Sequence, residues 1–273
     1  MAFRAKKKYG QNFLAEKSDI LGKIIDTAEI GKDDCVLEIG PGQGALTALL
    51  LDHAWALTAV EIDPDLEERL RRKFAGYERF ELIMADFLTL DLRAGLESWR
   101  DQGKRVKLVA NIPYYITSPI LRKLMEYRDL LDGIFIMVQK EVGKRICASS
   151  GKARGVLTLA VEYYGEASYG FTIDRSAFTP APNVDSAFIT IRPWKDRRWE
   201  QQIAGELFFR YIRTAFAGKR KTLLNNLAVL GISKAELSAI LTELGIDAAE
   251  RAENVSIAQF TRLIPRLEAA LGK

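Results

Sequence analysis

The feature that most constrains the fold is the alternation of short apolar runs with segments of helical periodicity over the first two-thirds of the chain. The runs are bounded by polar or glycine-containing segments, so we predict that they are strands. The predicted strands are 35–39, 55–60, 80–84, 106–110, 133–138, 169–173 and 187–191. Helices are predicted at 45–51, 64–74 and 118–127. Strands that alternate with helices indicate an α/β fold, in which helices cover both faces of a mostly parallel sheet.

The pattern changes after Pro193, where only helical periodicity remains. This periodicity is interrupted near Gly218, Gly231 and Gly245, as expected for short helices joined by turns. We therefore predict an α/β domain over residues 1–194, which starts with a basic arm at 1–14. A small all-α domain follows over residues 195–273.

The composition excludes several kinds of site. His53 is the one histidine, so a histidine-based triad or zinc site lacks partners. Cys35 and Cys147 are far apart and have no neighbour at disulfide or metal-ligand spacing. No apolar run approaches the ~18 residues that span a bilayer. No apolar segment follows the basic N-terminus, so we do not expect it to be a signal peptide. We expect a cytoplasmic protein that binds neither a metal nor a membrane.

Positive charge is concentrated in two segments, although the net charge is only +4. The stretch 195–221 holds eight Lys or Arg and three acids, and the first eight residues hold four more basic groups. Two basic segments on a nearly neutral chain suggest a polyanionic partner. Charge alone fits equally well with two solvated surface runs.

A glycine-rich turn follows the first predicted strand, in the sequence Glu38-Ile-Gly-Pro-Gly-Gln-Gly44. Glycines at 40, 42 and 44 allow a sharp turn and a close approach to a ligand at the N-terminus of the next helix. Glu61 ends the second strand, where an acid can bind both hydroxyls of a ribose. The spacing also satisfies a loose dinucleotide fingerprint, so a nicotinamide-dependent dehydrogenase stays open here.

Two acids favour S-adenosylmethionine over a dinucleotide. Glu38 precedes the first glycine, which is typical of methyltransferases, and it has no role in binding a pyrophosphate. Asp86 ends the third strand, where its carboxylate can accept a hydrogen bond from the N6 amine of a cofactor adenine. A helix N-cap or a turn residue is the alternative role for Asp86.

The motif Asn111-Ile112-Pro113-Tyr114 follows the fourth predicted strand. The N6 amine of adenine is a poor nucleophile, because its lone pair is delocalised into the ring. Two acceptors aimed at its hydrogens, the Asn111 side-chain oxygen and the Ile112 carbonyl, favour a tetrahedral nitrogen and stabilise its growing charge. Pro113 fixes the local chain, and Tyr114 offers a face for base stacking. A plain Asn-x-Pro turn with a buried tyrosine is the structural alternative.

The sequence resembles the ribosomal RNA adenine dimethyltransferases over nearly its whole length, and within them the members that act on 16S ribosomal RNA. Four motifs carry the resemblance: Lys8-Tyr-Gly-Gln-Asn-Phe-Leu14, Val36-Leu-Glu-Ile-Gly-Pro-Gly-Gln-Gly-Ala-Leu-Thr47, Phe178-Thr-Pro-Ala-Pro-Asn-Val-Asp-Ser-Ala187 and Gly218-Lys-Arg-Lys-Thr-Leu-Leu-Asn-Asn-Leu227. The resemblance implies a Rossmann-like class I methyltransferase sheet whose last strand is antiparallel. It also implies that S-adenosylmethionine is the cofactor and S-adenosylhomocysteine the product.

The resemblance assigns roles to individual residues. The implied cofactor contacts are Asn12, Leu14, Gly40, Glu61, Asp86 and Asn111. Phe178 would form a second wall of the base pocket, although a phenylalanine in this setting is often part of a core. One position departs from the family pattern, because Arg154 stands where we expect an aromatic residue of a loop that helps to shape the base pocket.

The implied reaction is the dimethylation of two adjacent adenosines near the 3′ end of 16S ribosomal RNA, in the 30S particle, by a monomeric enzyme. Basic residues of the C-terminal part are expected to contact phosphates: Arg213, Lys219, Arg220 and Lys221. Two alternatives remain open. One is a 23S ribosomal RNA adenine methyltransferase of the antibiotic-resistance type, and the other is a ribosome-assembly factor for which methylation is incidental.

Overall fold

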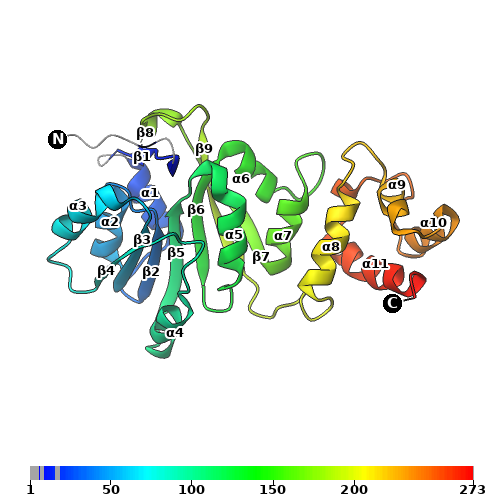
Figure 1. The fold of residues 1–273 in the computed structure, drawn as a ribbon, viewed down its shortest axis with the longest axis horizontal. Coiled ribbons are helices and arrows are strands. Elements are labelled where there is room, and N and C mark those ends of the chain that lie inside the picture. The colour runs from blue at the N-terminus through cyan, green and yellow to red at the C-terminus, as the bar shows by residue number, and fades with distance from the viewer. Residues whose placement is uncertain (1–5, 7–8, 16–18, 273) are drawn as a thin grey trace. The chain divides into compact units, whose positions relative to one another are not determined.

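The computed structural model describes residues 6, 9–15 and 19–272 (Figure 1). Half of the predicted basic arm, namely residues 1–5, 7 and 8, lies outside this part. The chain divides into two compact units. The first comprises Met1–Gly143 and Ala167–Pro193, and the second comprises Lys144–Glu166 and Trp194–Lys273.

The first unit is built on a seven-stranded sheet with the order β4-β3-β2-β5-β6-β9-β7. The strands are β2 (Asp34–Ile39), β3 (Ala56–Glu61), β4 (Phe80–Met84), β5 (Arg105–Asn111), β6 (Gly133–Gln139), β7 (Gly165–Ile173) and β9 (Ser186–Pro193). The pairs from β4 to β6 are parallel, and β9 is antiparallel to β6. The predicted strands and the predicted α/β class are confirmed.

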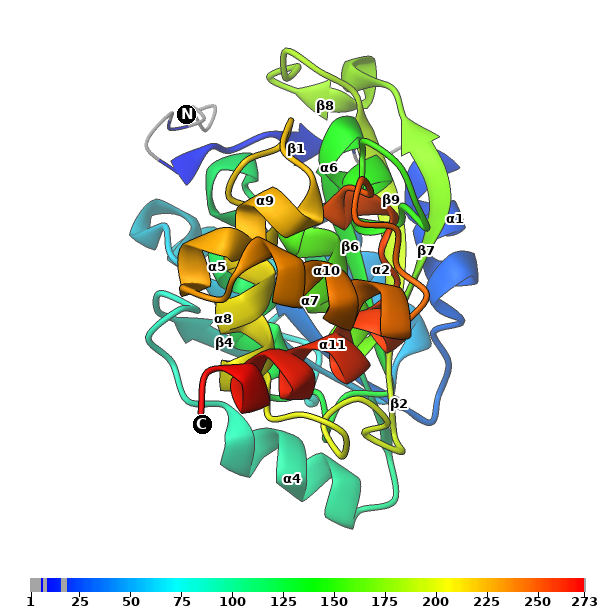
Figure 2. The same ribbon diagram turned by 90° about the vertical axis from the view of Figure 1, so that its right-hand side faces the viewer.

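Helices cover both faces of this sheet. They are α1 (Asp19–Ala28), α2 (Ala45–His53), α3 (Glu67–Lys73), α4 (Arg93–Asp101), α5 (Thr117–Met125) and α6 (Lys140–Ile146). Figure 2 shows α1 and α2 on one face and α4 and α5 on the other. The chain progresses in one direction from β2 to β4 and in the other from β5 to β6, so right-handed crossovers place the helices of these two halves on opposite faces. The order reverses between β2 and β5, where ligands bind in folds of this kind.

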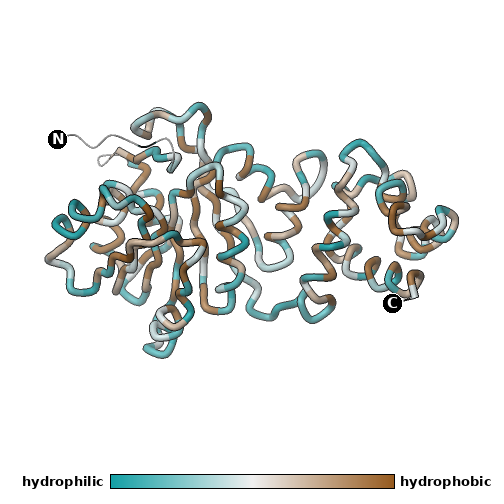
Figure 3. Tube along the Cα trace, in the orientation of Figure 1, coloured by the Kyte–Doolittle hydropathy of each residue, from teal (hydrophilic) through white to brown (hydrophobic). Residues whose placement is uncertain are grey.

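The core explains why the strands read as continuous apolar runs. Both faces of the central strands are covered, and every residue of β2 and β3 is buried. Figure 3 shows these strands as a largely hydrophobic centre. One cluster joins Ile24 of α1 and Leu50 of α2 to Val36 of β2 and Val109 of β5. The sheet is thus held rigidly, and only its edges are available for polar chemistry.

A second, two-stranded sheet was not predicted. It pairs β1 (Phe13–Leu14) with β8 (Phe178–Thr179) in antiparallel register, with Leu14 opposite Phe178 (Figure 1). Strands of two residues leave no periodicity in a sequence, so only the folded chain reveals them. This pairing attaches the N-terminal motif to the late motif.

The second unit is helical beyond Pro193. Its helices are α7 (Val156–Tyr164), α8 (Gly205–Ala215), α9 (Leu223–Leu227), α10 (Lys234–Glu243) and α11 (Ile257–Ala270). The predicted single boundary near residue 195 does not account for α7, which belongs to this unit because its Tyr163 ring stacks on Phe208 of α8 with centroids 4.7 Å apart. Helical periodicity shows that α7 has an apolar face, but not which core receives that face.

Arg154 also belongs to the second unit, where its side chain is buried. Its guanidinium donates to the Val255 carbonyl and, at 2.5 Å, to Glu162 Oε2. Arg154 does not line the pocket described below. The departure from the family pattern is therefore a structural ion pair within the helical unit.

Candidate active site

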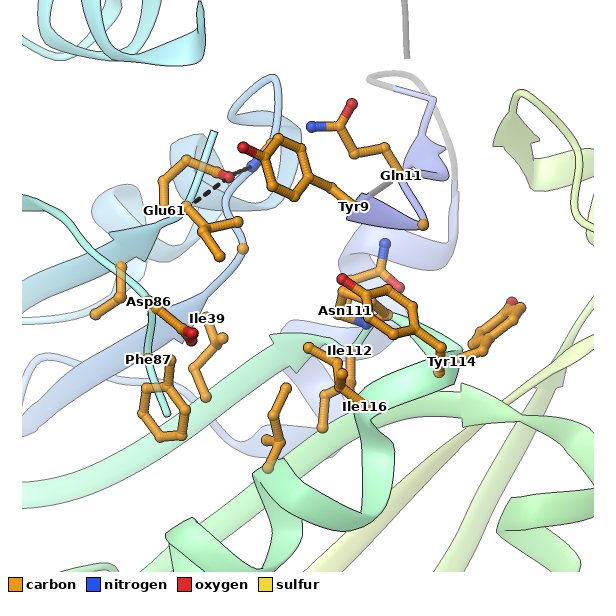
Figure 4. A pocket seen from close by; sticks show the side chains of 18 of the residues that line it. Tyr9, Gln11, Ile39, Glu61, Asp86, Phe87, Asn111, Ile112, Tyr114 and Ile116 are labelled. Atoms are coloured by element: carbon orange, nitrogen blue, oxygen red, sulfur yellow. Dashed lines mark hydrogen bonds between the residues drawn. The ribbon is translucent and has the colours of Figure 1, made fainter. Parts of the chain in front are cut away.

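A pocket opens at the carboxyl edge of the large sheet (Figure 4). About 800 Å³ of space free of protein atoms lies in this pocket, and this figure includes space open to solvent. Carboxyl ends of neighbouring parallel strands meet at one edge, so residues that follow β2, β3, β4 and β5 converge here. The predicted site residues that line it are Asn12, Gly40, Glu61, Asp86, Asn111, Ile112, Pro113 and Tyr114.

The glycine turn after β2 forms the floor of this pocket and requires glycine for two reasons. Gly40, Gly42 and Gly44 have φ angles of +70°, +58° and +78°, which L side chains rarely adopt. A Cβ atom on Gly42 would also lie 2.7 Å from Phe13, and one on Gly44 would lie 2.7 Å from Phe74. At Gly40 such a Cβ would lie no closer than 3.9 Å to its nearest neighbour, the Asn111 carbonyl oxygen. The backbone at Gly40 is thus accessible from the crevice.

Glu61, at the end of β3, is buried and held by backbone donors. Its Oε2 accepts from Gly42 N at 3.1 Å, and its Oε1 accepts from Ile62 N and Asp63 N, both at 2.9 Å. Burial raises the pKa of Glu61, and the three N–H groups oppose that rise. These bonds fix the carboxylate plane, and Oε2 keeps a lone pair for a further donor such as a ribose hydroxyl.

Asp86 follows β4 on the same side of the pocket (Figure 4). Its Oδ1 accepts from Leu88 N at 2.9 Å, so Asp86 does have the predicted turn role. The turn uses one carboxylate oxygen and leaves Oδ2 for a ligand donor. The structural and the ligand-binding roles of Asp86 are therefore compatible.

Asn111 is the last residue of β5, and its amide orientation is fixed by the N-terminal segment. Its Nδ2 donates to the backbone carbonyl of Asn12 at 2.9 Å. An amide whose nitrogen is used in this way presents Oδ1 as an acceptor. The next residue, Ile112, is buried and donates its backbone N–H to Met137 O at 3.2 Å. The predicted acceptor thus stands on a rigid strand end.

Tyr114 begins a 3₁₀ turn, Tyr114–Ile116. Its hydroxyl lies 2.6 Å from Ser186 Oγ on β9, and burial raises its pKa. The ring is half-buried and lines the pocket, so it is not the fully buried tyrosine of the structural alternative. A ring held at its hydroxyl end presents a fixed surface to a bound base.

Leu14 and Phe178 are the two predicted site residues that do not line the pocket. Phe178 is 3% exposed and packs in the same apolar cluster as Leu14. Leu14 does border a smaller crevice beside Gly40 and Asn111. The structure gives Phe178 a core position, so its role as a second wall of the base pocket stays a prediction.

Residues 9–14, which we call the strap, cross the pocket and are anchored by contacts that sequence reasoning missed. Gln11 Nε2 donates to Asp63 Oδ2 at 2.8 Å, and Lys6 Nζ lies 2.6 Å from Asp63 Oδ1. Asp63 N in turn binds Glu61. These partners are more than fifty residues apart in sequence, so no local pattern could have linked them. The strap is thereby connected to the predicted ribose acid.

Glu38 has a buried carboxylate atom, Oε2, that has no hydrogen-bond partner within the described residues. Burial, with the nearby charge of Glu61, raises the pKa of Glu38 to about 8. The side chain borders the smaller crevice together with Gly40 and Asn111. An unpaired buried carboxylate is costly unless a cationic ligand joins it, and the amino group of S-adenosylmethionine has the required charge. The residues present therefore fit this cofactor.

Two further observations concern metal binding and membrane crossing. The described ranges contain no group of three or more His, Cys, Asp or Glu side chains suited to a metal ion. Within the same residues, no helix combines the length and the apolar character that crossing a membrane requires.

Known proteins share this architecture over nearly the whole chain. Residues 2–269 match the family described as ribosomal RNA adenine dimethylase. The ribosomal RNA small subunit methyltransferase A of Fusobacterium nucleatum is 56% identical over 98% of this chain and 99% of its own length. The protein of the same name from Lactococcus lactis is 43% identical over 97% of this chain and 90% of its own.

Two solved structures agree with this assignment. A dimethyladenosine transferase from Plasmodium falciparum has a TM-score of 0.80 at 26% identity and covers 94% of this chain and 98% of its own. The 23S rRNA methyltransferase ErmE has a TM-score of 0.71 at 28% identity, covering 94% of this chain and 100% of its own. The chain therefore belongs to the ribosomal RNA adenine dimethylase family and is an S-adenosylmethionine-dependent methyltransferase of ribosomal RNA adenine.

Proposed function

We propose that this enzyme methylates N6 of two adjacent adenosines in a loop near the 3′ end of 16S ribosomal RNA, within the 30S particle, during small-subunit biogenesis. The product is N6,N6-dimethyladenosine, and S-adenosylmethionine becomes S-adenosylhomocysteine. The observation that carries the proposal is the fixed amide of Asn111, whose Oδ1 stands as an acceptor beside the glycine turn and Glu61. The small-subunit relatives supply the choice of RNA.

We assign cofactor binding to residues around the crevice. Glu61 Oε2 would accept from a ribose hydroxyl, Asp86 Oδ2 from the adenine amine, and Glu38 would pair with the amino group. The remaining contacts are assigned to Asn12, Leu14, Gly40 and Asn111. When bound, S-adenosylmethionine supplies an electrophilic methyl group on a sulfonium. No metal is part of the proposal.

The chain contributes geometry rather than a strong base. Asn111 Oδ1 and the Ile112 carbonyl accept the two N6 hydrogens, which directs the nitrogen lone pair out of the ring plane. The same acceptors stabilise the positive charge that grows on N6. Tyr114 fixes the ring by stacking, and Pro113, with φ −56°, holds the carbonyl of Ile112 in place. The released proton passes to water, since the product amine is a weak base.

The second methylation uses the same acceptors. N6-methyladenine has one hydrogen left, so the base must present that hydrogen to Asn111 or Ile112 while the first methyl group occupies the other side. The pocket is partly open to solvent, which leaves room for this group. An extruded loop base is also easier to bind than a duplexed one, since unstacking costs a few kcal/mol.

We assign phosphate contacts to basic side chains of the helical unit, Arg213, Lys219, Arg220 and Lys221, which are exposed. Asn226 fixes the loop that carries three of them, because it binds Ala215 O at 2.7 Å and Gly218 N at 3.0 Å. Contacts of this kind give salt-dependent affinity with little sequence information. A monomeric, cytoplasmic enzyme is part of the same proposal.

The alternatives are weaker. The 23S rRNA methyltransferase ErmE is 28% identical, whereas the Fusobacterium small-subunit relative is 56% identical. Family membership removes the dehydrogenase. A binding factor with incidental methylation predicts that an N111A variant still supports subunit assembly, which a rescue assay in cells that lack the gene would measure.

The direct test is methyl transfer from labelled S-adenosylmethionine to undermethylated 30S particles. Mature 30S and 50S particles serve as controls. We expect four methyl groups on each undermethylated particle, because two adenosines each receive two. Mass spectrometry of the RNA would place them. Transfer to 50S particles alone, or to no particle, would contradict the proposal.

A further inference from the structure

Tyr115 is a large aromatic side chain at the mouth of the active-site pocket, and no role has been assigned to it above. It lines the pocket together with Tyr114, yet it is 60% exposed. A single exposed aromatic residue is unremarkable elsewhere on a protein surface. Its position beside the residues that hold the target base makes it a candidate for contact with the RNA.

One side of the Tyr115 ring is supported by the strap. Gly10 has φ +59°, and a Cβ atom placed there would lie 3.0 Å from Tyr115 Cε1 and 3.1 Å from Cδ1. The strap backbone therefore approaches this ring as closely as a residue without a side chain allows. Packing on one side restricts the ring, while its exposed part stays available to a partner.

Tyr115 cannot complete a sandwich around the base that rests on Tyr114. The two residues are consecutive in a 3₁₀ turn, in which successive side chains point about 120° apart because there are 3.0 residues per turn. The hydroxyl of Tyr114 is also tied to Ser186 inside the fold, whereas Tyr115 remains in solvent. The two rings therefore offer separate surfaces.

We propose that Tyr115 stacks against the base next to the adenine held at Tyr114, so that two consecutive tyrosines bind two consecutive adenosines. The proposal rests on the proposed function, which places a second adenosine beside the target. Stacking on an aromatic side chain requires only a flat base. Tyr115 is thus a positioning residue for RNA, and it does not touch the reacting nitrogen.

The test uses the full-length enzyme and undermethylated small subunits reconstituted with 16S ribosomal RNA. One RNA has both adenosines, and a second has uridine in place of the neighbour of the scored adenosine. Y115A removes the ring, Y115F keeps its face, and Y115L keeps apolar bulk against Gly10 without a flat face. Y77A is the matched control, since Tyr77 is 40% exposed and lies outside the pocket lining.

With adjacent adenosines, we expect Y115A and Y115L to raise KM for the particles about tenfold, the usual scale for loss of one base stack. Their kcat and their cofactor Kd should stay near wild type, and Y115F and Y77A should behave as wild type. With uridine as the neighbour, the difference between wild type and Y115L should shrink, because a pyrimidine stacks weakly.

Three outcomes decide the question. If wild type methylates the particles and Y115L has an unchanged KM, the stacking proposal is overturned. It is also overturned if the loss is the same beside uridine as beside adenosine, since the contact is then not with the neighbouring base. If wild type binds S-adenosylmethionine but methylates neither particle, the proposed function itself has failed, which is distinguishable from both.

Discussion

Strand β2 carries two buried carboxylates that differ in whether other protein groups pair with their oxygens. Asp34, at its amino end, is 0% exposed and accepts from Arg105 Nε at 2.7 Å and Lys107 Nζ at 3.0 Å. Glu38, near its carboxyl end, is 2% exposed and has an oxygen with no partner in the described chain. Asp34 is satisfied by the protein itself, whereas the unpaired oxygen of Glu38 is the basis for its proposed pairing with the cofactor.

The contrast extends to the two edges of the sheet. At the amino edge, Lys107 also donates to the carbonyls of Ala28 at 2.9 Å and Glu29 at 2.7 Å, which end α1. At the carboxyl edge lie the positive-φ glycines and the free acceptor of Asn111. Unusual backbone conformations and unpaired polar groups occur mainly where a bound ligand would supply the missing contacts. The amino edge should therefore determine stability, and the carboxyl edge should determine activity.

The largest effect on stability is expected from Lys107→Met at the amino edge. The change removes a buried cation and leaves Asp34 and two carbonyls with fewer partners, so the free energy of unfolding should fall by about 3 kcal/mol. Denaturant unfolding measures it. Lys104→Met is the control, because Lys104 is near the surface and 3.7 Å from Asp33, and it should cost under ~1 kcal/mol. Equal losses would remove the distinction between the two edges.

Asn111→Ala should have the opposite profile. Loss of one aligned acceptor should lower kcat by about 10²–10³-fold, while S-adenosylmethionine still binds, with a Kd raised at most several-fold because Asn111 is one of several cofactor contacts. Single-turnover transfer and calorimetric binding measure the two quantities. Near-normal turnover would refute the mechanism, and a large loss of stability would show that the carboxyl edge also has a structural role.

Glu38→Gln tests the unpaired carboxylate by pH. Because the folded pKa is raised to about 8, the folded state holds this proton after the unfolded state has lost it. The contribution of the Glu38 carboxyl group to the free energy of unfolding is therefore complete at acid pH. It decreases as the pH rises toward 8, by up to ~1.4 kcal/mol per pH unit. We expect E38Q to become more stable relative to wild type by about 1 kcal/mol between pH 6.5 and 7.5. Parallel pH profiles in thermal unfolding would contradict this.

The smallest effect is expected where the strap is anchored. Asp63→Asn weakens the contacts with Lys6 and Gln11, whose hydrogen bonds hold the pKa of Asp63 below its ordinary value despite burial. Cofactor Kd should rise several-fold, by about 1 kcal/mol. Asp65→Asn is the control, since the Asp65 side chain is exposed and contacts only Lys6 among these residues, and the backbone N–H that it donates to Asp63 is kept in the variant. If D65N weakens cofactor binding as much as D63N does, the anchor at Asp63 is not specific.

The sequence predicted the sheet well because each central strand is buried on both faces, and a buried strand must be apolar along its length. It also predicted eight of the residues that line the pocket, since residues just beyond β2, β3, β4 and β5 are brought together by parallel strand order alone. Glu61, Asp86 and Asn111 are cases of this kind. Helix α4 was missed, although the apolar residues Leu92, Leu96 and Trp99 lie at helical spacing in this mostly polar segment.

The sequence by itself determined the α/β class and the glycine turn, and it carries the amine chemistry that we propose for Asn111-Ile-Pro-Tyr114, because strand burial, positive φ and acceptor geometry each demand particular residue types at short spacing. Only the tertiary structure decided that Phe178 packs with Leu14, that Arg154 binds Val255 and that Gln11 reaches Asp63. These contacts join residues far apart in the chain. Their partners are selected by how whole elements pack, and local sequence does not record that choice.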